Sequence, residues 1–377
     1  MSTTSSPAPS ALPKPTVRKL SNATASAISA GESAFHALAS QVGGHPGVLA
    51  SEDNALIVKQ SLHKERTFYE LLAQESMELV YLQKFVPKFY GTLRLEGQVA
   101  SVPAAAQQSA GGVAVDDGTG IVPVPESIVL QNVASEFTKP NIMDIKLGTV
   151  LYEEGATEEK KQRMLETARN TTSFETGIRL TGFQVFDYTK NESIITPKSY
   201  GKSIKTSDLP EGVRRFFPVS SLPADSNKPE GLGLPLNLLL PILRGILYDI
   251  RELRDGLAKT ELRMVGGSLL IVYEADWEVD RSLLDVQAQE RQGMSEAELA
   301  NSAGFGAEGK KDEEDDGYDS DSDDSEEEER SPYVVKLIDF AHTHLTPGEG
   351  PDEGVLKGMD TTISLFEGRI KELETGA

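Results

Sequence analysis

The segment Lys139-Pro140-Asn141-Ile142-Met143-Asp144-Ile145-Lys146-Leu147-Gly148 places an acid and a base two residues apart within an apolar run. Side chains two apart on a β-strand point to the same face, so a strand here would present Asp144 and Lys146 together. A carboxylate accepts hydrogen bonds from polyol hydroxyls, and an ammonium neutralises the oxygens of a phosphoryl group in transfer. The pair therefore suits phosphoryl transfer to a polyol, and the alternative is a half-buried ion pair on a structural strand.

The spacing extends to the pattern P-x-x-x-D-x-K-x-G, formed by Pro140, Asp144, Lys146 and Gly148. Three more segments follow it in the chain: Gly267-Ser268-Leu269-Leu270 with Tyr273-Glu274, then Ile338-Asp339-Phe340-Ala341-His342-Thr343, and Gly358-Met359-Asp360. Together these four segments resemble the inositol polyphosphate kinase family, over residues from about Lys59 to about Phe366. Within that family the chain is most similar to the fungal multikinase branch.

The resemblance implies an α+β fold of two lobes, similar to those of protein kinases and ATP-grasp enzymes. A small antiparallel-sheet lobe is followed by a larger α+β lobe. We expect a disordered tail over residues 1–30, an N-terminal nucleotide-binding lobe over 31–133 and a C-terminal catalytic and inositol-binding lobe over 134–377. Order is expected to begin near Ala55, where a short apolar strand precedes a helical pattern starting at Glu65.

Composition excludes several other classes of protein. The 377 residues can hold two ordinary domains or one two-lobed enzyme. There is no cysteine, which excludes disulfides and zinc fingers with thiolate ligands. The first residues lack the basic and apolar parts of a secretory signal, and no apolar run approaches the roughly 20 residues that cross a bilayer. We therefore expect a soluble protein without a transmembrane segment.

Several nucleotide and nucleic-acid motifs are also missing from the sequence. It contains neither a P-loop nor a G-x-G-x-x-G after a strand, and it lacks the H-R-D segment of protein kinases. Basic clusters interleaved with aromatic residues are lacking as well, so direct binding of nucleic acid is not expected.

The formal net charge of −22 is concentrated in one part of the chain. Asp312 to Glu329 contains thirteen acidic residues, so a basic pocket elsewhere can still hold phosphates, because screening acts over about 8 to 10 Å. Self-repulsion predicts a disordered acidic insertion over about 287–330. It would serve either as a solubilising segment or as a docking site for basic nuclear proteins.

The resemblance implies a nucleotide site that binds ATP with Mg²⁺. Lys59, held by Glu65, would contact the α- and β-phosphates, and the backbone from Gln131 to Val133 would form the hinge that meets adenine. Asp339 would hold Mg²⁺ with help from Ser268. From the residues alone, an exposed lysine at a strand end is the favoured interpretation of Lys59, and Asp339 could equally be a turn former.

The substrate site would use Lys146 as the catalytic cation between the γ-phosphate and the attacking hydroxyl. Asp144 would orient hydroxyls, those of the ribose included. A helix beginning at Glu158 would bring Lys160 and Arg163 to the inositol phosphates, and His342 would lie close to the substrate. The alternatives are a solvated helix surface and a structural histidine.

Together, these expectations describe an ATP-dependent inositol polyphosphate multikinase that converts inositol trisphosphate and tetrakisphosphate to the pentakisphosphate. Two alternatives stay open: an inositol hexakisphosphate kinase, and a nuclear scaffold of transcription complexes that acts through the acidic insertion. Phosphoinositide lipids also stay open as substrates. We expect a monomer that is present in the nucleus and the cytoplasm.

Overall fold

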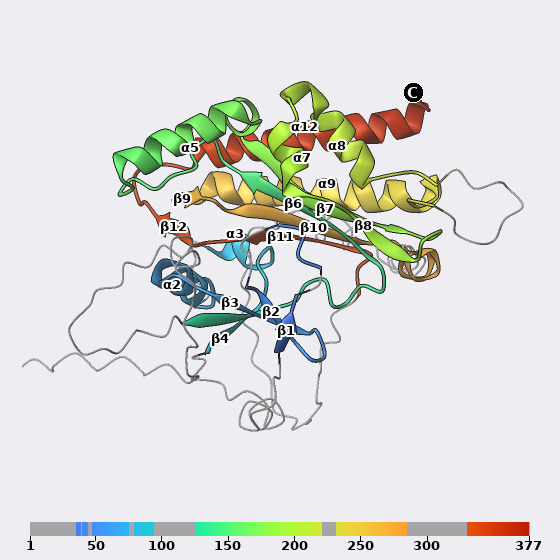
Figure 1. The fold of residues 1–377 in the computed structure, drawn as a ribbon, viewed down its shortest axis with the longest axis horizontal. Helices are drawn as coiled ribbons and strands as arrows, with labels where there is room; N and C mark the ends of the chain where they lie inside the picture. Colours follow the sequence, from blue (N-terminus) through green and yellow to red (C-terminus); the bar gives the residue numbers. More distant parts are fainter. Residues whose placement is uncertain are drawn as a thin grey trace, which may run out of the picture.

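The computed structural model describes residues 35–38, 40–43, 47–74, 79–93, 126–220, 231–284 and 330–376 (Figure 1). The expected N-terminal tail and the acidic run from Asp312 to Glu329 lie outside these described residues. Among the described helices, none is both long enough and apolar enough to cross a membrane.

The first sheet is antiparallel and is built from residues that precede Val133. Its five strands lie in the order β1-β2-β3-β5-β4. They are β1 (Phe35–Ala37), β2 (Leu49–Ser51), β3 (Leu56–Gln60), β4 (Phe89–Leu93) and β5 (Ser127–Gln131). Two helices accompany them, α2 (His63–Leu72) and α3 (Val80–Gln83).

The prediction that order begins near Ala55 was wrong, because β1 and β2 precede it. Each of these strands has only three residues, too few to produce a recognisable alternation of apolar and polar side chains. The strand expected at Ala55 and the helix expected at Glu65 are present as β3 and α2.

The second sheet is also antiparallel and has β6 at its centre. Its order is β11-β10-β6-β7-β8. The strands are β6 (Pro140–Leu147), β7 (Ile178–Asp187), β8 (Glu192–Thr196), β10 (Ser268–Glu274) and β11 (Tyr333–Ile338). A separate two-stranded sheet pairs β9 (Leu262–Val265) with β12 (His342–Leu345).

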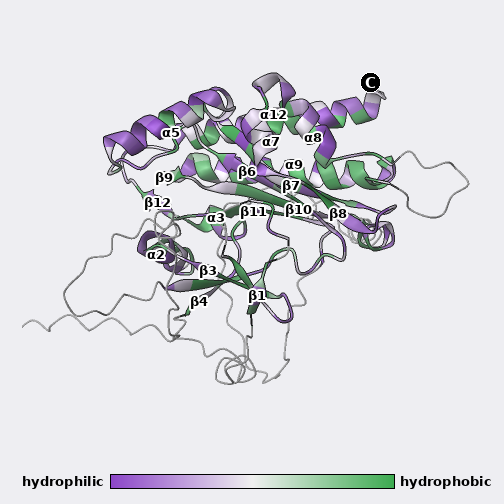
Figure 2. Ribbon diagram, viewed as in Figure 1, coloured by the Kyte–Doolittle hydropathy of each residue, from purple (hydrophilic) through white to green (hydrophobic). Residues whose placement is uncertain are grey.

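Helices cover the face of the second sheet that points away from the first sheet (Figure 1). They are α5 (Glu158–Asn170), α6 (Ser173–Thr176), α7 (Lys198–Ser203), α8 (Leu209–Phe216), α9 (Leu236–Lys259) and α12 (Glu353–Thr375), with a 3₁₀ turn η1 (Thr206–Asp208) before α8. The longest of them, α9, buries leucines and isoleucines at helical spacing. Figure 2 shows these apolar residues on the helix and on the strands beneath it.

The two faces of β6 belong to different environments because its side chains alternate. Met143, Ile145 and Leu147 are at most 1% exposed and lie in the main core with α9. Ile142 lies on the opposite face, in a second cluster with residues of the N-terminal region. Helix packing on one face therefore directs Asp144 and Lys146 toward the first sheet.

The Gly358-Met359-Asp360 segment lies in α12 and makes structural contacts. A Cβ at position 358 would lie 2.4 Å from the backbone oxygen of Gly177, so the glycine permits close packing of α12 against the start of β7. Asp360 accepts hydrogen bonds from Arg254 of α9, at 2.8 and 3.3 Å.

Candidate active site

Asp144 and Lys146 lie on one face of β6, as their spacing predicts. In the register with β10, Asp144 is opposite Leu270 and Lys146 is opposite Ser268. On the other side, Asp144 pairs with Gly182 of β7 and Ile145 pairs with Leu180, which leaves Thr181 as an extra residue in a β-bulge beside Asp144. Bulges of this kind are frequent next to active sites, where they redirect side chains.

The side chain of Lys59, in the first sheet, contacts two carboxylates near the Asp144–Lys146 pair. Its Nζ lies 2.9 Å from Glu65 Oε1 and 2.5 Å from Asp339 Oδ1. Glu65 is buried in α2, whereas Asp339 follows β11 of the second sheet. Burial by itself would lower the pKa of Lys59, but Asp339 and Glu65 reverse this and raise it above the usual value. The lysine is therefore a fixed cation between the two sheets, and its expected contact with Glu65 is present.

Asp339 adopts a left-handed backbone conformation with φ of 67°. Aspartate is one of the few non-glycine residues that accept this conformation, and such strained positions concentrate at functional sites. Its carboxylate acts on both members of the β6 pair: after burial it adds to the rise in the pKa of Asp144, and it opposes the lowering of the Lys146 pKa that burial causes. Three segments far apart in sequence thus contribute to one charged cluster.

The Asp144 carboxyl is more enclosed than the sequence suggests, with 3% of the residue exposed. Burial raises its pKa to about 6 and Asp339 adds to the rise, against opposing contributions from Ser268, Lys146 and Thr181. Within the described part of the chain, Oδ1 has no hydrogen-bond partner. A buried acceptor without a donor is costly, so this atom is available to a ligand.

Lys146 has a second cation beside it. Its Nζ donates to the backbone oxygen of Gly266 at 2.9 Å, and burial lowers its pKa, with Arg179 acting in the same direction. Arg179 lies opposite Lys146 on β7, and its buried Nη1 has no hydrogen-bond partner among the described residues. Sequence reasoning missed Arg179, although an arginine between Ile178 and Leu180 in an apolar strand is a detectable signal.

The segment between β1 and β2 contacts Asp144. Sequence reasoning missed this contact as well. A Cβ at position 43 would lie 1.9 Å from Asp144 Oδ2, so only glycine fits there. Val42 is buried with Val133 and Ile142, and its backbone oxygen lies so close to Gly182 that a Cβ there would be 2.1 Å away. Gly43 therefore covers one oxygen of the Asp144 carboxylate.

The residues expected to form the hinge lie where the chain leaves the first sheet. Gln131 ends β5, and its backbone N–H donates to Lys88 O at 2.9 Å while its side chain donates to Glu136 at 3.0 Å. Val133 is buried in the cluster that contains Val42. The proposed contact of this backbone with adenine stays a prediction.

A second group of charges lies around the start of α5. Thr157 caps the helix by accepting from the Lys160 N–H. Glu153 Oε2 is 2.8 Å from Lys64 Nζ of α2 and 3.4 Å from His342 Nδ1 of β12. The pKa of Glu153 lies below its usual value, first because Lys64 donates to it, and the pKa of His342 is lowered, first by burial. The charge of Lys160 contributes to both shifts. Lys160 and His342 therefore belong to one group of interacting charges, and their contact with the substrate stays a prediction.

Arg163 differs from Lys160 in its surroundings. Its side chain is exposed on α5, and no described contact links it to Glu153, His342 or Lys160. Its role toward the substrate stays a prediction.

A metal ion would find oxygen donors beside Asp339. The Asp339 carboxylate and the Ser268 hydroxyl are oxygen ligands of the kind that Mg²⁺ prefers, and Ser268 is paired with Ile338, the residue before Asp339. In the described residues no three His, Asp or Glu side chains group as a complete metal site. The donor set therefore fits an ion that takes its remaining ligands from phosphates and water.

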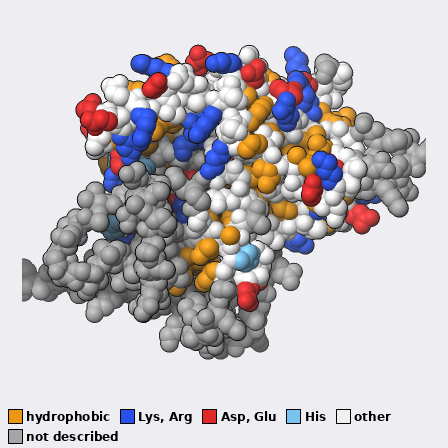
Figure 3. Space-filling view, viewed as in Figure 1, with side chains coloured by type: hydrophobic (Ala, Val, Ile, Leu, Met, Phe, Trp, Pro, Cys, Tyr) orange, Lys and Arg blue, Asp and Glu red, His pale blue; other side chains and the backbone are white. Residues whose placement is uncertain are grey.

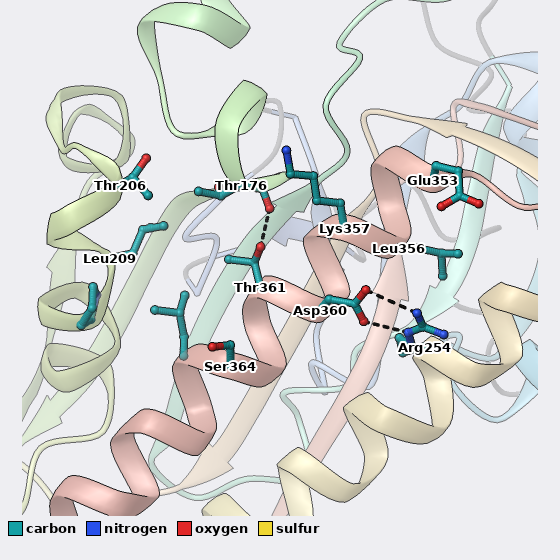
Figure 4. A pocket seen from close by; sticks show the side chains of 12 residues that line it. Thr176, Thr206, Leu209, Arg254, Glu353, Leu356, Lys357, Asp360, Thr361 and Ser364 are labelled. Carbon is teal, nitrogen blue, oxygen red and sulfur yellow. Dashed lines mark hydrogen bonds and ion pairs between the residues drawn. The ribbon is translucent and has the colours of Figure 1, made fainter.

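A cavity of about 510 Å³ lies elsewhere, between α6, α8, α9 and α12 (Figure 4). Its walls include Arg254 and Asp360, which pair with each other, and Thr361, which donates to Thr176 O at 2.7 Å. These groups are already satisfied by contacts within the fold. The charged cluster at β6, not this cavity, is therefore the candidate active site.

Comparison with protein families supports this assignment. The model of the family described as inositol polyphosphate kinase matches residues 127–367. The chain belongs to the inositol polyphosphate kinase family. The matched range contains Asp144, Lys146, Ser268 and Asp339. The chain is therefore a kinase, a phosphotransferase that acts on inositol phosphates.

Curated relatives include both multikinases and hexakisphosphate kinases. The inositol polyphosphate multikinase of Saccharomyces cerevisiae is 26% identical over 371 residues, which cover 88% of this chain and 98% of the relative. That of Schizosaccharomyces pombe is 29% identical over 243 residues, covering 62% and 77%. Mouse inositol hexakisphosphate kinase 3 is 25% identical over 246 residues, covering 63% of this chain and 50% of the relative.

A solved structure shares the fold. The inositol phosphate multikinase Ipk2 of S. cerevisiae, in complex with ADP and Mn²⁺, superposes with a TM-score of 0.53 and 24% sequence identity. The match covers 84% of this chain and 99% of that chain. The expected α+β inositol polyphosphate kinase fold is confirmed.

Proposed function

We propose that this chain is an ATP-dependent inositol polyphosphate multikinase that converts inositol trisphosphate and tetrakisphosphate to the pentakisphosphate. One observation carries the proposal. Asp339 Oδ1 lies 2.5 Å from the Nζ of Lys59 in the first sheet, and its charge also acts on Asp144 and Lys146 in the second sheet. The similarity to the S. cerevisiae multikinase over 98% of its length supports the same choice.

In this proposal the nucleotide lies between the two sheets. The backbone from Gln131 to Val133 would meet adenine, and Lys59 would exchange part of its contact with Asp339 for the α- and β-phosphates. The relative Ipk2 was solved with ADP and Mn²⁺, which supports use of a nucleotide and a divalent cation. Asp339 and Ser268 would hold Mg²⁺, which when bound neutralises phosphate charge.

Phosphoryl transfer would take place beside β6. Lys146 lies next to Asp144 and Asp339, where its ammonium can bridge the γ-phosphate and the attacking inositol hydroxyl. Asp144 would use its unpartnered Oδ1 to accept a hydrogen bond from a hydroxyl group and so orient it. Arg179 adds a second cation for the negative charge that develops during in-line transfer.

The acceptor would extend from Lys146 toward α5. Lys160, Arg163 and His342 would contact its phosphates, and Lys160 and His342 already lie within one electrostatic cluster. Several cations on different elements suit an acceptor with phosphates around a ring, because each contact fixes another position.

A hexakisphosphate kinase is the second candidate, and the alignment to mouse inositol hexakisphosphate kinase 3 favours keeping it. A panel of inositol phosphates with labelled ATP and Mg²⁺, followed by chromatography of the products, separates the two. We expect label in tetrakis- and pentakisphosphates from the trisphosphate. Label appearing only in pyrophosphate products of the hexakisphosphate would replace the proposal with the second candidate.

Other expectations also stay proposals. The acidic run lies outside the described residues and would bind basic nuclear proteins, which would make a scaffold role additional to catalysis. We propose a monomer that acts in the nucleus and the cytoplasm. Adding a phosphoinositide lipid to the substrate panel tests whether lipids are also phosphorylated.

A further inference from the structure

Glu153 is an acid in the middle of the cations that the proposed function assigns to the acceptor. It lies in the loop between β6 and α5, and its Oε2 is 2.8 Å from Lys64 Nζ and 3.4 Å from His342 Nδ1. Figure 3 shows lysine and arginine side chains gathered over α5 and on the surface next to it. Glu153 is therefore a carboxylate that lies within ion-pair distance of both Lys64 and His342.

The cluster joins three elements that are far apart in the sequence. Lys64 comes from α2, which accompanies the first sheet, His342 from β12 and Lys160 from the first turn of α5. Glu153 has a pKa below its usual value, first because Lys64 donates to it, and His342 and Lys160 act in the same direction. All three groups thus stabilise the ionised carboxylate.

We propose that Glu153 is an internal competitor for the acceptor's phosphates, which occupies Lys64 and its neighbours until a phosphate group displaces it. This inference rests on the proposed function, because it assumes that Lys160 and His342 face the acceptor. Glu153 thereby weakens the binding of acceptor and product alike, and it limits how tightly a highly phosphorylated product is held.

The exchange is energetically feasible because the ion pair is partly exposed. The side chain of Lys64 is 57% exposed and that of Glu153 is 27% exposed, and ion pairs in such surroundings contribute little to stability. A phosphate monoester carries about two negative charges and can accept from several cations at once. It therefore competes effectively with a single carboxylate.

The test is equilibrium binding of inositol hexakisphosphate by isothermal titration calorimetry without nucleotide. This probe has a phosphate on every ring carbon, so one of them faces the cluster in any orientation. We expect Glu153→Gln to tighten binding roughly three- to tenfold at 50 mM salt, and the gain to shrink at 500 mM salt. Because no catalysis is measured, the result is independent of whether the chain phosphorylates its proposed substrates.

Glu154→Gln is the matched control, since it removes the same charge from the adjacent, exposed position. We expect it to leave the dissociation constant within twofold of the wild type. Lys64→Met should weaken binding, and in that background Glu153→Gln should bring a smaller gain than in the wild type. The Lys64→Met measurement also tests the proposal by itself if Glu153→Gln does not fold.

Three results would overturn the proposal. They are unchanged or weaker binding by Glu153→Gln, an equal gain from Glu154→Gln, and binding by Lys64→Met that is as tight as that of the wild type.

Discussion

Asp144 is placed where its charge is unfavourable for folding and useful for binding. It is 3% exposed, its Oδ1 has no partner among the described residues, and its pKa is raised to about 6, first by burial and then by Asp339. An isolated structural strand would gain stability from an apolar residue at this position. Retaining an acid there is typical of a site that gives up stability for activity.

The variant Asp144→Asn should be more stable but inactive. Because the folded pKa of about 6 lies above the ordinary value of 3.8, ionisation of Asp144 opposes folding fully above pH 6 and not at all below about pH 4. The gain in the free energy of unfolding should be on the order of 3 kcal/mol at pH 7.5 and about half of that at pH 5.

Urea denaturation at the two pH values measures this gain, and initial rates measure the loss of turnover. A variant that is less stable than the wild type at pH 7.5 would show that the carboxylate makes a net favourable contribution to folding.

At the scale of a structural element, the connection between β1 and β2 contributes an unexpected contact to the site. Two three-residue strands hold a segment whose Gly43 lies against Asp144 and whose Val42 packs with Val133 and Ile142. It thereby links the first sheet to the carboxylate on β6. The element positions Asp144 through backbone contact and contributes no charged side chain of its own.

The variant Gly43→Ala should impair catalysis more than folding. The added Cβ would lie 1.9 Å from Asp144 Oδ2, so the segment or the carboxylate must move. Displacements of about 1 Å near reacting groups can lower the rate about a hundredfold, and we expect kcat/KM for ATP to fall by about ten- to a hundredfold.

Gly368→Ala in α12 is the control, because nothing lies within 4 Å of its Cβ. It should leave the kinetics unchanged and raise stability by about 0.5–1 kcal/mol. Wild-type kinetics in Gly43→Ala would mean that the segment moves away from Asp144 without consequence.

At the scale of the whole molecule, more than half of the formal net charge of −22 comes from one acidic run in the sequence, so the total does not describe the charge around the site. Helices cover one face of the second sheet (Figure 1). Lys146 and Arg179 are paired across β6 and β7 on its other face, and Lys59 of the first sheet contacts Asp339 beside them. Thirteen of the acids lie between Asp312 and Glu329, outside the described residues. Salt screens exposed charges over about 8 to 10 Å, so we expect these acids to affect the site little.

Deleting Asp312 to Glu329 should therefore leave kinase activity within about twofold of the wild type at 150 mM salt. The deletion changes the formal net charge from −22 to −9. Binding to a basic protein such as a histone, measured by pull-down at the same salt, should be lost. A large loss of kcat would assign the acidic run a role in catalysis, and retained histone binding would exclude it as the docking site.

Patterns local in sequence predicted the core of the site. The two-residue alternation of a strand was sufficient to place Asp144 and Lys146 on one face. The Lys59–Glu65 contact was implied by the family resemblance and is present in the structure. Asp339 was identifiable because an acid ends an apolar strand. The family resemblance supplied the order in which these segments combine.

Contacts that depend on long-range register were not predictable. Arg179 faces Lys146 only because β7 pairs with β6, and Glu153 meets Lys64 only because α2 lies beside β12. Gly43 reaches Asp144 through two strands too short to recognise. Arg163 shows the opposite case, since its position on α5 was predicted but its side chain has no described contact with the cluster.

In the proposed mechanism Lys146 lies between the nucleotide and the acceptor and acts on the transferred phosphoryl group. The most direct test compares Lys146→Ala with the wild type in two measurements: kcat with inositol trisphosphate, and the dissociation constant of a fluorescent ATP analogue. We expect kcat to fall by about a hundredfold or more, because the lost interaction belongs to the transition state, while nucleotide affinity changes less than threefold. Unchanged turnover, or a loss confined to nucleotide binding, would contradict the account.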